Sequence, residues 1–469
     1  MRRTKIICTL GPASSDPSII KEMILAGMNV ARLNLSHGNH EQHLNYMNAV
    51  KVQREKLNMP VAIMIDLKGP EFRIREFADG SVELINGAIF TLTTGNVIGN
   101  SSIVSVTYKD LPNIVSSGDR ILLNDGRIEL EVVQVNKFDI VTKVVEGGVL
   151  SNNKSINLPN INVDMPFLTD VDKNDIRFAI ENDAEFIALS FVRGAEDVAI
   201  VKKFIKDNGG KDKNIKLISK IENEQGIKNI NAIIEESDGI MVARGDLGVE
   251  LDFKQIPVYQ KAIIEKCLHA GKTVIVATEM LDSMIEDSRP TRAEITDVAN
   301  AVLDGASATM LSGETAAGKN VVKCVETMRD IIETCEKNFI IKTEIADIDG
   351  KETSRSIAYA CKTLADKVDT KAIVVVSLTG KSVYEVAGFK PQCPIIACTT
   401  NSKIYNQLAL CWNVVPTKID FYETTDSLLE ASKKSALSTK LVQKGDTIIQ
   451  TAGIPLGNVP TNLLKIETI

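Results

Sequence analysis

The sequence repeats one unit eight times: a short apolar run followed by a segment with helical periodicity. The runs lie at residues 5–10, 29–35, 61–67, 186–191, 215–221, 239–243, 273–277 and 307–311. They are continuous rather than alternating in polarity, which is typical of parallel strands covered on both faces. After the sixth run, helical spacing is seen in Ile256, Tyr259, Ile263 and Cys267, and Gly271 follows as a predicted C-cap. Eight such units predict an α/β fold of the (β/α)8 TIM barrel type. A doubly wound open sheet is the alternative, because periodicity alone does not exclude it.

The barrel pattern is interrupted once and then replaced near the C-terminus. Between the third and fourth runs, short alternating stretches such as SVELI, IFTLTT and IELEVVQV are separated by Gly, Asn and Asp. They predict a small β-barrel domain inserted at 69–166, above the barrel face where βα-loops build active sites, as a lid would be. The barrel then occupies 1–68 and 167–337. The runs AIVVVSL, PIIACT, WNVVPT and DTIIQTA predict a separate C-terminal α/β domain at 338–469.

Composition excludes several classes of protein. The 469 residues carry a net charge of −7 and only 4% aromatic side chains, which argues against nucleic-acid binding. No apolar stretch reaches 18 residues, and the first run is too short for a signal peptide, so we expect a cytoplasmic protein without a membrane span. The eight cysteines include no CxxC pair, which favours buried or inert thiols in a reducing compartment.

Polar residues gather where the predicted strands end. Six of the eight runs lead into polar segments, namely ARLNLSHG, DLKGPEFR, SKIEN, VARGDLG, ATEML and LSGET. One polar strand end is ordinary, because strand ends meet water. Six ends rich in Arg, Lys, Asp, Glu and Gly on one rim of a barrel indicate a functional site.

The charged residues of this rim suit phosphate chemistry. Glu222 and Asp246 are two carboxylates of the kind that hold Mg²⁺ while leaving positions for substrate oxygens. Arg32, Arg73 and Lys220 supply cations for phosphate groups. Each residue alone has an ordinary structural explanation, such as a surface salt bridge, but the set favours a site.

Further residues of the rim supply a close backbone approach and oxygen ligands. Gly245 removes a side chain where a backbone can approach a ligand closely. Asn34, Ser36 and Asp66 are hard oxygen ligands suited to a second, larger cation. Phosphoryl transfer needs a metal and clamps for charge and alignment, with little covalent help from the protein.

A series of segments resembles the signature segments of pyruvate kinases. The segments are ICTLGPAS, MNVARLNLSHG, DLKGPEFR, NLPNINVDMP, SKIEN, VARGDLGVE, ATEMLDSM, RPTRAE, VANAVLDGA and MLSGETAAG. They follow that family's order and cover the predicted barrel and insertion nearly end to end, so the resemblance is specific. It implies transfer of the phosphoryl group of phosphoenolpyruvate to ADP, giving pyruvate and ATP, with Mg²⁺ (or Mn²⁺) and K⁺. It further implies the bacterial type without an extra C-terminal phosphohistidine-type domain.

The resemblance also implies roles for the cation ligands. By it, Glu222 and Asp246 bind Mg²⁺. The implied K⁺ ligands are Asn34, Ser36, Asp66 and the backbone carbonyl of Leu67. Leu67 stands where many members have Thr, but because the implied ligand is a backbone oxygen we expect little change.

The same resemblance implies roles toward the substrates. Arg32 contacts the transferring phosphate, and Lys220 neutralises charge on the phosphoryl group and on the enolate oxygen left behind. The backbone at 244–246, including Gly245 and Asp246, binds the substrate carboxylate. Thr278 helps to position the proton delivered to the methylene carbon, through water. The residues implied in nucleotide binding are Arg73, Lys154, Asn34 and His37.

Four further residues near these motifs raise specific expectations. Glu279 follows Thr278 where Gln is common, and it either adds a carboxylate near an anion site or points away. Glu71 lies close to the implied K⁺ ligands, and family members that work without K⁺ tend to have Lys at the matching position. His40 and His43 are expected to be solvated helix residues rather than zinc ligands, since no Cys or carboxylate pattern completes a zinc set.

The C-terminal domain holds a candidate effector site. The run AIVVVSL leads through a short turn into VYEVAGF, an arrangement that suits an anion, although an ordinary turn with an N-capping Ser is the alternative. The candidate residues are Ser377, Thr379, Gly380, Lys381 and Ser382. The resemblance implies a phosphorylated small-molecule effector here, facing the loop at 451–458, and a homotetramer.

Two other functions remain open from the sequence. A metal-dependent carbon–carbon lyase acting on pyruvate or a 2-oxo acid also fits a barrel with Mg²⁺ and an Arg. Arg32 with Arg73, and Lys154 in the insertion, favour a nucleotide partner instead. A catalytically silent effector-binding subunit is the other alternative, against which the intact Lys220 and Glu222 argue.

Overall fold

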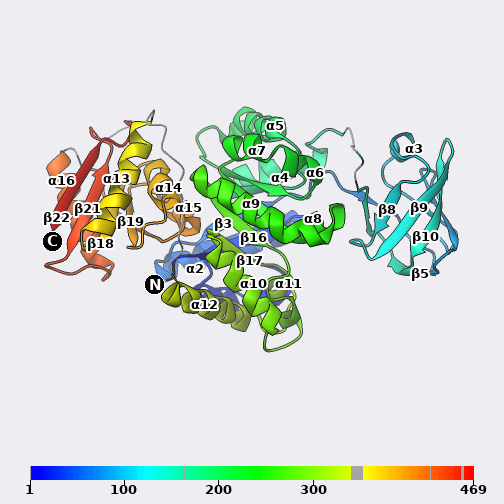
Figure 1. Ribbon diagram of the computed structural model, residues 1–469, viewed down its shortest axis with the longest axis horizontal. Helices are drawn as coiled ribbons and strands as arrows, with labels where there is room; N and C mark the ends of the chain where they lie inside the picture. The colour runs from blue at the N-terminus through cyan, green and yellow to red at the C-terminus, as the bar shows by residue number, and fades with distance from the viewer. Residues whose placement is uncertain (1, 160, 162–164, 340–351, 423, 456–458) are drawn as a thin grey trace.

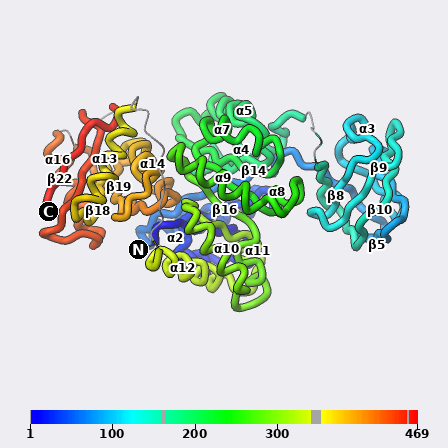
Figure 2. The backbone as a smooth tube through the Cα atoms, in the orientation of Figure 1, coloured from blue at the N-terminus to red at the C-terminus, as the bar shows by residue number. Residues whose placement is uncertain are grey.

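A computed structural model describes residues 2–159, 161, 165–339, 352–422, 424–455 and 459–469. Residues 160 and 162–164 of the segment NLPNINVDMP, and 456–458 of the loop at 451–458, lie outside the described residues. Three parts lie in a row, with the barrel in the middle, the inserted β domain at one end and the C-terminal α/β domain at the other (Figure 1). The chain starts on the barrel edge next to the C-terminal domain and ends on the outer side of that domain (Figure 2).

Eight parallel strands close into the predicted barrel. They are β1 (Lys5–Thr9), β2 (Val30–Asn34), β3 (Ala62–Asp66), β13 (Phe186–Leu189), β14 (Lys216–Ile221), β15 (Gly239–Ala243), β16 (Thr273–Ala277) and β17 (Ala308–Leu311). Their order around the barrel is β1-β17-β16-β15-β14-β13-β3-β2. Each strand falls within one apolar run of the sequence, so the TIM-barrel prediction is confirmed and the open sheet is excluded.

Helices cover the outside of the barrel. The main ones are α1 (Pro17–Ala26), α2 (His40–Leu57), α4 (Asp170–Glu181), α5 (Ala195–Ile205), α7 (Ile230–Glu236), α9 (Ile256–His269), α10 (Arg292–Leu303) and α12 (Val321–Asn338). Shorter elements are η1 (Pro12–Ser14), η2 (Lys206–Gly210), α6 (Glu224–Lys228), α8 (Arg244–Glu250), η3 (Phe253–Gln255), η4 (Asp282–Ile285) and α11 (Gly313–Ala316). As predicted, Gly271 terminates α9: it lies just past the cap residue Ala270 with φ +66°.

The insertion is a β domain with its own core. Its strands are β4 (Phe72–Arg73), β5 (Ser81–Leu84), β6 (Ile89–Thr93), β7 (Ile103–Ser105), β8 (Arg120–Leu123), β9 (Ile128–Val135), β10 (Asp139–Glu146), β11 (Gly148–Ser151) and β12 (Ser155–Asn157), with one helical turn, α3 (Leu111–Ile114). Seven of them form a sheet in the order β4-β12-β8-β9-β10-β6-β7. Backbone bonds from Arg75 N to Ser105 O, 2.8 Å, and from Thr107 N to Arg73 O, 2.9 Å, join the two ends of this sheet, which therefore curls into a small barrel.

The C-terminal domain is a five-stranded sheet covered by helices. Its strands follow the order β20 (Val414–Lys418), β19 (Ile395–Thr399), β18 (Thr370–Val376), β21 (Thr447–Ala452) and β22 (Leu463–Thr468). Its helices are α13 (Thr353–Lys367), α14 (Lys381–Gly388), α15 (Ser402–Gln407), η5 (Leu408–Leu410) and α16 (Thr425–Ser438). The antiparallel edge strand β22 was not predicted. The exact boundaries between the three parts, at 68/69, 166/167 and 337/338, stay a prediction.

The C-terminal domain covers the N-terminal end of the barrel. Leu410 of η5 is fully buried and belongs to the same apolar cluster as the inward-facing strand residues Ile7 and Phe186. Lys5 Nζ donates to Val414 O at 2.8 Å. Asn413 N donates to Arg3 O, just before β1, at 2.9 Å. The opposite, carboxyl end of the barrel is left for a site, as in other barrels.

Two sequence expectations concern the whole chain. All eight cysteines are free thiols, and seven of them are buried, as expected for inert thiols. Among the described helices, we find none with the length and apolar character needed to span a membrane.

Candidate active site

The carboxyl ends of β2, β3 and β14 bring together a buried ionic network. Arg32 Nε donates to Asp66 Oδ2 at 2.7 Å, and Arg32 Nη1 donates to Thr9 Oγ1 at 2.9 Å. Lys220 Nζ lies 3.2 Å from Asp66 Oδ1 and 2.9 Å from Glu222 Oε1. The side chain of Lys220 is 10% exposed, and the two carboxylates are 1% exposed. The rim therefore carries two fixed cations, Arg32 and Lys220, and little water reaches them to weaken their interactions with an anion.

Neighbouring charges decide the ionisation of this network. Burial disfavours ionised Asp66, but Lys220 and Arg32 outweigh it and hold the pKa of Asp66 below its usual value. Burial also opposes the charge on Lys220, yet Asp66 and Glu222 raise the pKa of its ammonium. Burial raises the pKa of Glu222 to about 7, Asp246 adds to this effect, and Lys220 opposes it. Lys220 therefore stays protonated at neutral pH. The ionised form of Glu222 would be stabilised by any further cation beside it.

Glu222 and Asp246 are the pair that suits a divalent ion. Glu222 Oε2 accepts a hydrogen bond from Phe191 N at 2.6 Å, while its buried Oε1 has no hydrogen bond of good geometry despite the nearby Lys220 amine. Asp246 lies in the first turn of α8. No group of three His, Cys, Asp or Glu side chains among the described residues forms a complete metal site. Two carboxylates that each raise the energy of the other's charge fit Mg²⁺, which keeps other positions for substrate and water.

The oxygens suited to a larger cation come from two adjacent strand ends. Asn34 and Asp66 are paired in register across β2 and β3. Asn34 Oδ1 accepts from Ser36 N at 3.2 Å, which fixes the turn after β2. The side chain of Leu67 is buried, and its carbonyl oxygen accepts a hydrogen bond from Ser190 Oγ at 2.7 Å.

Ser190 is a site residue that the sequence reasoning missed. It follows β13 directly, receives a hydrogen bond from Lys220 Nζ at 2.8 Å and donates to Leu67 O. It thus connects the lysine to the oxygens at the end of β3. The available signal was a hydroxyl residue at the end of the apolar run at 186–191, the same kind of position as the other rim residues.

A strained turn after β16 holds the start of α8. Thr278 and Glu279 have φ values of +70° and +54°, which are uncommon for residues other than glycine. Thr278 Oγ1 accepts from Gly245 N at 2.8 Å and donates to Ala277 O at 2.6 Å. Arg244 Nη2 donates to Thr278 O at 2.5 Å. The predicted residues Gly245, Asp246 and Thr278 therefore form one connected unit.

The side chain of Glu279 is exposed and lines a neighbouring cavity with Arg244, Gly245 and Asp297. Arg244 forms an ion pair with Asp297 at 2.6 Å in the same region. The carboxylate of Glu279 therefore faces the cavity beside Arg244 and Gly245.

The predicted nucleotide residues lie on two domains. Arg73 is on β4 and pairs with the strand that follows Lys154, since Ser155 and Arg73 are register partners. Arg73 Nη1 donates to Asn153 O at 2.7 Å, and Ile74 N donates to Lys154 O at 3.0 Å. Asn34 and His37 instead lie on the barrel rim.

One prediction about the histidines is wrong. His43 is only 4% exposed, its Nε2 lies 2.7 Å from His37 O, and burial lowers its pKa. It lies on the buried face of α2 with Met47 and Val50. His40 is half-exposed and lies 2.6 Å from an Asp175 oxygen rather than being fully solvated. The buried residues His43, Met47 and Val50 recur at helical spacing, so His43 belongs to the face of α2 that packs inward.

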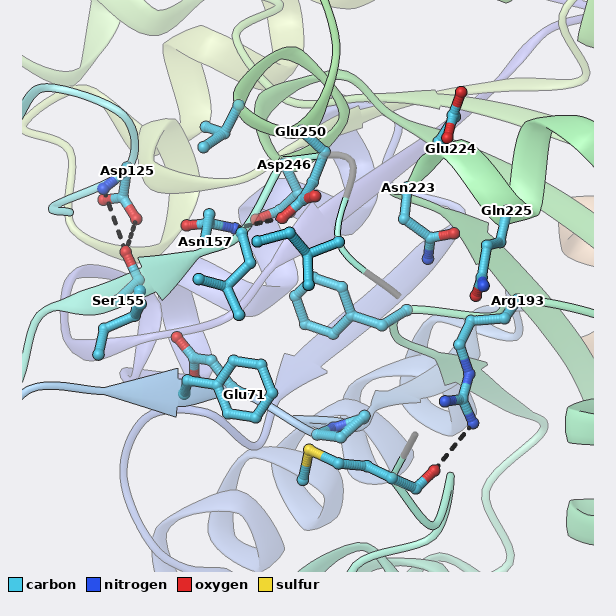
Figure 3. Close-up of a pocket in the computed structure, with 18 residues that line it drawn as sticks. Glu71, Asp125, Ser155, Asn157, Arg193, Asn223, Glu224, Gln225, Asp246 and Glu250 are labelled. Atoms are coloured by element: carbon cyan, nitrogen blue, oxygen red, sulfur yellow. Dashed lines mark hydrogen bonds between the residues drawn. The ribbon is translucent and has the colours of Figure 1, made fainter. Parts of the chain in front are cut away.

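A cavity of about 150 Å³ separates the inserted domain from the rim (Figure 3). Glu71 and Phe72 line it from the start of the inserted domain, and Phe191 and Asp246 line it from the barrel. Glu71 itself is paired with Arg73, whose Nη2 lies 2.9 Å from its Oε2.

The candidate effector residues form a second polar pocket, of about 230 Å³. Ser377 Oγ accepts from Gly380 N at 3.0 Å, and Thr379 Oγ1 accepts from Lys381 N at 3.4 Å. The Ser382 hydroxyl is hydrogen bonded to that of Thr461. The pocket is lined by Ser354, Val376, Ser377, Leu378, Thr379, Lys381, Ser382, Gly453, Val459, Pro460 and Thr461. Gly380 caps α14 without a side-chain hydrogen bond, so the N-cap residue is not a Ser, and an ordinary turn stays the alternative to an effector site.

Comparison with known proteins gives one consistent answer. Residues 1–325 match the family model described as pyruvate kinase, barrel domain, and residues 355–467 match the one described as pyruvate kinase, alpha/beta domain. The chain is 41% identical to the pyruvate kinase of Clostridium acetobutylicum over the full length of both. It is 43% identical to the pyruvate kinase of Geobacillus stearothermophilus, covering all of this chain and 80% of that protein.

The fold comparison agrees. A crystal structure of a pyruvate kinase from Cryptosporidium parvum superposes with a TM-score of 0.93 at 36% identity, covering 100% of this chain and 96% of the other. These full-length matches exclude the alternative of a carbon–carbon lyase. With both domain models matched and the barrel rim built from the expected residues, the chain belongs to the pyruvate kinase family.

Proposed function

We propose that the network around Lys220 is the centre at which this chain moves the phosphoryl group of phosphoenolpyruvate to ADP, the last step of glycolysis. The observation that carries the proposal is the position of the Lys220 amine, which is buried at the carboxyl end of a closed barrel between Asp66 and Glu222. A fixed cation in a site of low polarity stabilises developing negative charge far better than one in water.

Lys220 and Arg32 divide the work on the transferring group. Ion pairs with Asp66 and Glu222 and a hydrogen bond to Ser190 Oγ hold the lysine amine in place, so little reorganisation is needed during the reaction. It neutralises charge on the phosphoryl group and on the enolate oxygen left behind. Arg32 is fixed through its Nε and Nη1 atoms, which leaves Nη2 for the phosphate.

Glu222 and Asp246 would hold Mg²⁺ or Mn²⁺, and Asn34, Ser36, Asp66 and the carbonyl of Leu67 would hold K⁺. When bound, the ions supply positive charge opposite the phosphate oxygens. The mutual repulsion of the Glu222 and Asp246 carboxylates, which a cation would relieve, and the register pairing of Asn34 with Asp66 support these assignments.

The remaining rim residues orient the substrates. The backbone at 244–246, with Gly245 and Asp246, receives the substrate carboxylate, since its hydrogen bond to Thr278 fixes it in place. Thr278 positions the water-borne proton for the methylene carbon. Arg73 and Lys154 hold the nucleotide phosphates from the inserted domain, opposite Asn34 and His37 on the rim.

The proposal also includes an effector site and an oligomeric state. A phosphorylated small molecule binds in the pocket of Ser377, Thr379, Gly380, Lys381 and Ser382. The family further supports a homotetramer that works in the cytoplasm, without nucleic-acid or membrane partners.

A coupled assay with phosphoenolpyruvate and ADP tests the proposal. Pyruvate should form with Mg²⁺ and K⁺ present and stop when Mg²⁺ is chelated. A chain that shows no turnover while binding a sugar phosphate would instead be the catalytically silent subunit, and the proposed site would be wrong.

A further inference from the structure

One side-chain hydrogen bond joins the inserted domain to the barrel beside the site. Asn157 Nδ2 donates to Glu250 Oε1 at 3.0 Å, and Figure 3 shows this bond next to Asp246. Both side chains are half-buried. Burial raises the pKa of Glu250, and Asn157 opposes this by donating to its carboxylate. A partly buried carboxylate is stabilised by a donor, and here the donor comes from another domain.

On the inserted domain, this bond fixes the strand that carries the nucleotide residues. Asn157 is the last residue of β12, and Lys154 precedes the same strand. Ser155 of β12 is the register partner of Arg73 on β4. The position of Asn157 therefore determines where Arg73 and Lys154 lie relative to the barrel.

On the barrel, the bond reaches the helix that begins at the substrate site. Glu250 is the last residue of α8, and Asp246 lies one turn earlier. Gly126 of the inserted domain also approaches the same end of the helix closely, since a Cβ at this position would lie only 3.4 Å from Val249 Cγ1. In Figure 1, α8 is the barrel helix that reaches toward the inserted domain.

The two contacts are connected within the inserted domain. Ser155 Oγ donates to Asp125 Oδ1 at 2.8 Å, so the turn that contains Asp125 and Gly126 is tied to β12. The inserted domain thus meets the last turn of α8 through β12 and this turn, which are hydrogen bonded to each other.

We propose that Glu250 is a positioning residue: its bond to Asn157 sets the angle of the inserted domain at which Arg73 and Lys154 deliver the nucleotide phosphates to Lys220. The inference rests on the proposed function. Phosphoryl transfer depends on alignment, so a small tilt of the domain costs rate without removing any reacting group.

A swap of the two side chains separates this role from ordinary packing. Asn157→Asp places two carboxylates against each other, and we expect KM for ADP to rise and kcat to fall, with kcat/KM down about 10-fold or more. Glu250→Gln keeps an acceptor oxygen and should stay within about 3-fold of wild type. In the double variant, the amide introduced by Glu250→Gln donates to the carboxylate introduced by Asn157→Asp. This bond replaces the original one with its direction reversed, and kcat/KM for ADP should return to within about 3-fold of wild type.

Three measurements complete the test. KM for phosphoenolpyruvate should change less than about 2-fold in Asn157→Asp, because the barrel residues are untouched. Asn136→Asp adds the same charge on the exposed β9–β10 turn and should match wild type. If Asn157→Asp lowers the unfolding midpoint, Asn157→Leu removes the donor without adding charge and should show the same selective rise in KM for ADP.

The outcomes distinguish this inference from the proposed site. If Asn157→Asp behaves like wild type while Lys220→Met is inactive, the positioning role is wrong and the site stands. If the double variant is as impaired as Asn157→Asp, the bond does not position the domain. If Lys220→Met keeps the wild-type rate, the proposed function of the rim is wrong instead.

Discussion

The amine of Lys220 lies 2.9 Å from Oε1 of Glu222, two residues further along the same strand end. Successive residues of a strand point to opposite sides, so the spacing of two in SKIEN brings both side chains to the same side of the barrel wall. Lys220 therefore forms ion pairs with both Glu222, a proposed Mg²⁺ ligand, and Asp66 at the end of β3.

Lys220→Met should lower kcat about 10²-fold or more, with a smaller effect on KM, because the lost interaction is strongest in the transition state. Steady-state kinetics with phosphoenolpyruvate and ADP measure both constants. Circular dichroism should show a folded barrel, and a variant with the wild-type kcat would show that Lys220 has another role.

Ser190→Ala should weaken both the orientation of Lys220 and the fixing of the Leu67 carbonyl, since one hydroxyl serves both. We expect kcat to fall about 10-fold and the K⁺ concentration for half-maximal rate to rise. A titration of rate against K⁺ measures the second effect. Ser117→Ala, at an exposed hydroxyl of the inserted domain, is the matched control.

Wild type should depend strongly on K⁺, and Glu71→Lys should be largely independent of it. Glu71 lies at the start of the inserted domain, shortly after the proposed K⁺ ligands Asp66 and Leu67 in the sequence, and is paired with Arg73, so the substitution replaces a negative charge by a positive one. Rates in K⁺ and in a bulky organic cation at equal ionic strength provide the comparison. Equal wild-type rates in the two salts would contradict the prediction.

A phosphorylated sugar or nucleotide should lower KM for phosphoenolpyruvate by shifting a two-state equilibrium. Fructose 1,6-bisphosphate, ribose 5-phosphate and AMP are the candidates for a saturation series. The combined variant Ser377→Ala, Thr379→Ala and Ser382→Ala should lose the response, because it removes three of the hydroxyls that line the pocket. A shift that persists in this variant would place the effector elsewhere.

Lys390→Met should stabilise the protein at neutral pH. Lys390 is 3% exposed, its Nζ has no hydrogen bond in the described residues, and burial lowers its pKa to about 7. Because the unfolded lysine binds a proton at higher pH than the folded one, wild-type stability should rise as pH increases from about 7 to about 10.5. The variant should unfold a few degrees higher than wild type at pH 7, and the gain should shrink toward pH 10. Thermal unfolding across this range measures the effect; a gain that is constant with pH would contradict it.

The sequence predicted features that follow from periodicity and from strand ends. All eight barrel strands and the polar rim around Lys220 were found in this way, because buried parallel strands are continuous apolar runs. Strand β22 was missed, since it is a half-exposed edge strand without such a run. His43 was misplaced because its burial depends on which face of α2 meets the barrel, which is a property of tertiary packing and not of local composition.

Leu410 connects the hydrophobic cores of the C-terminal domain and the barrel. Its side chain, from the C-terminal domain, lies in the apolar cluster that fills the barrel with Ile7 and Phe186. Detaching that domain would expose the floor of the barrel to water, so the two should open together as one cooperative unit in hydrogen exchange. The inserted β domain has a separate core, and its amides can exchange without disturbing the rest. A ligand that stiffens the C-terminal sheet therefore acts on the same structural unit that supports the reacting residues.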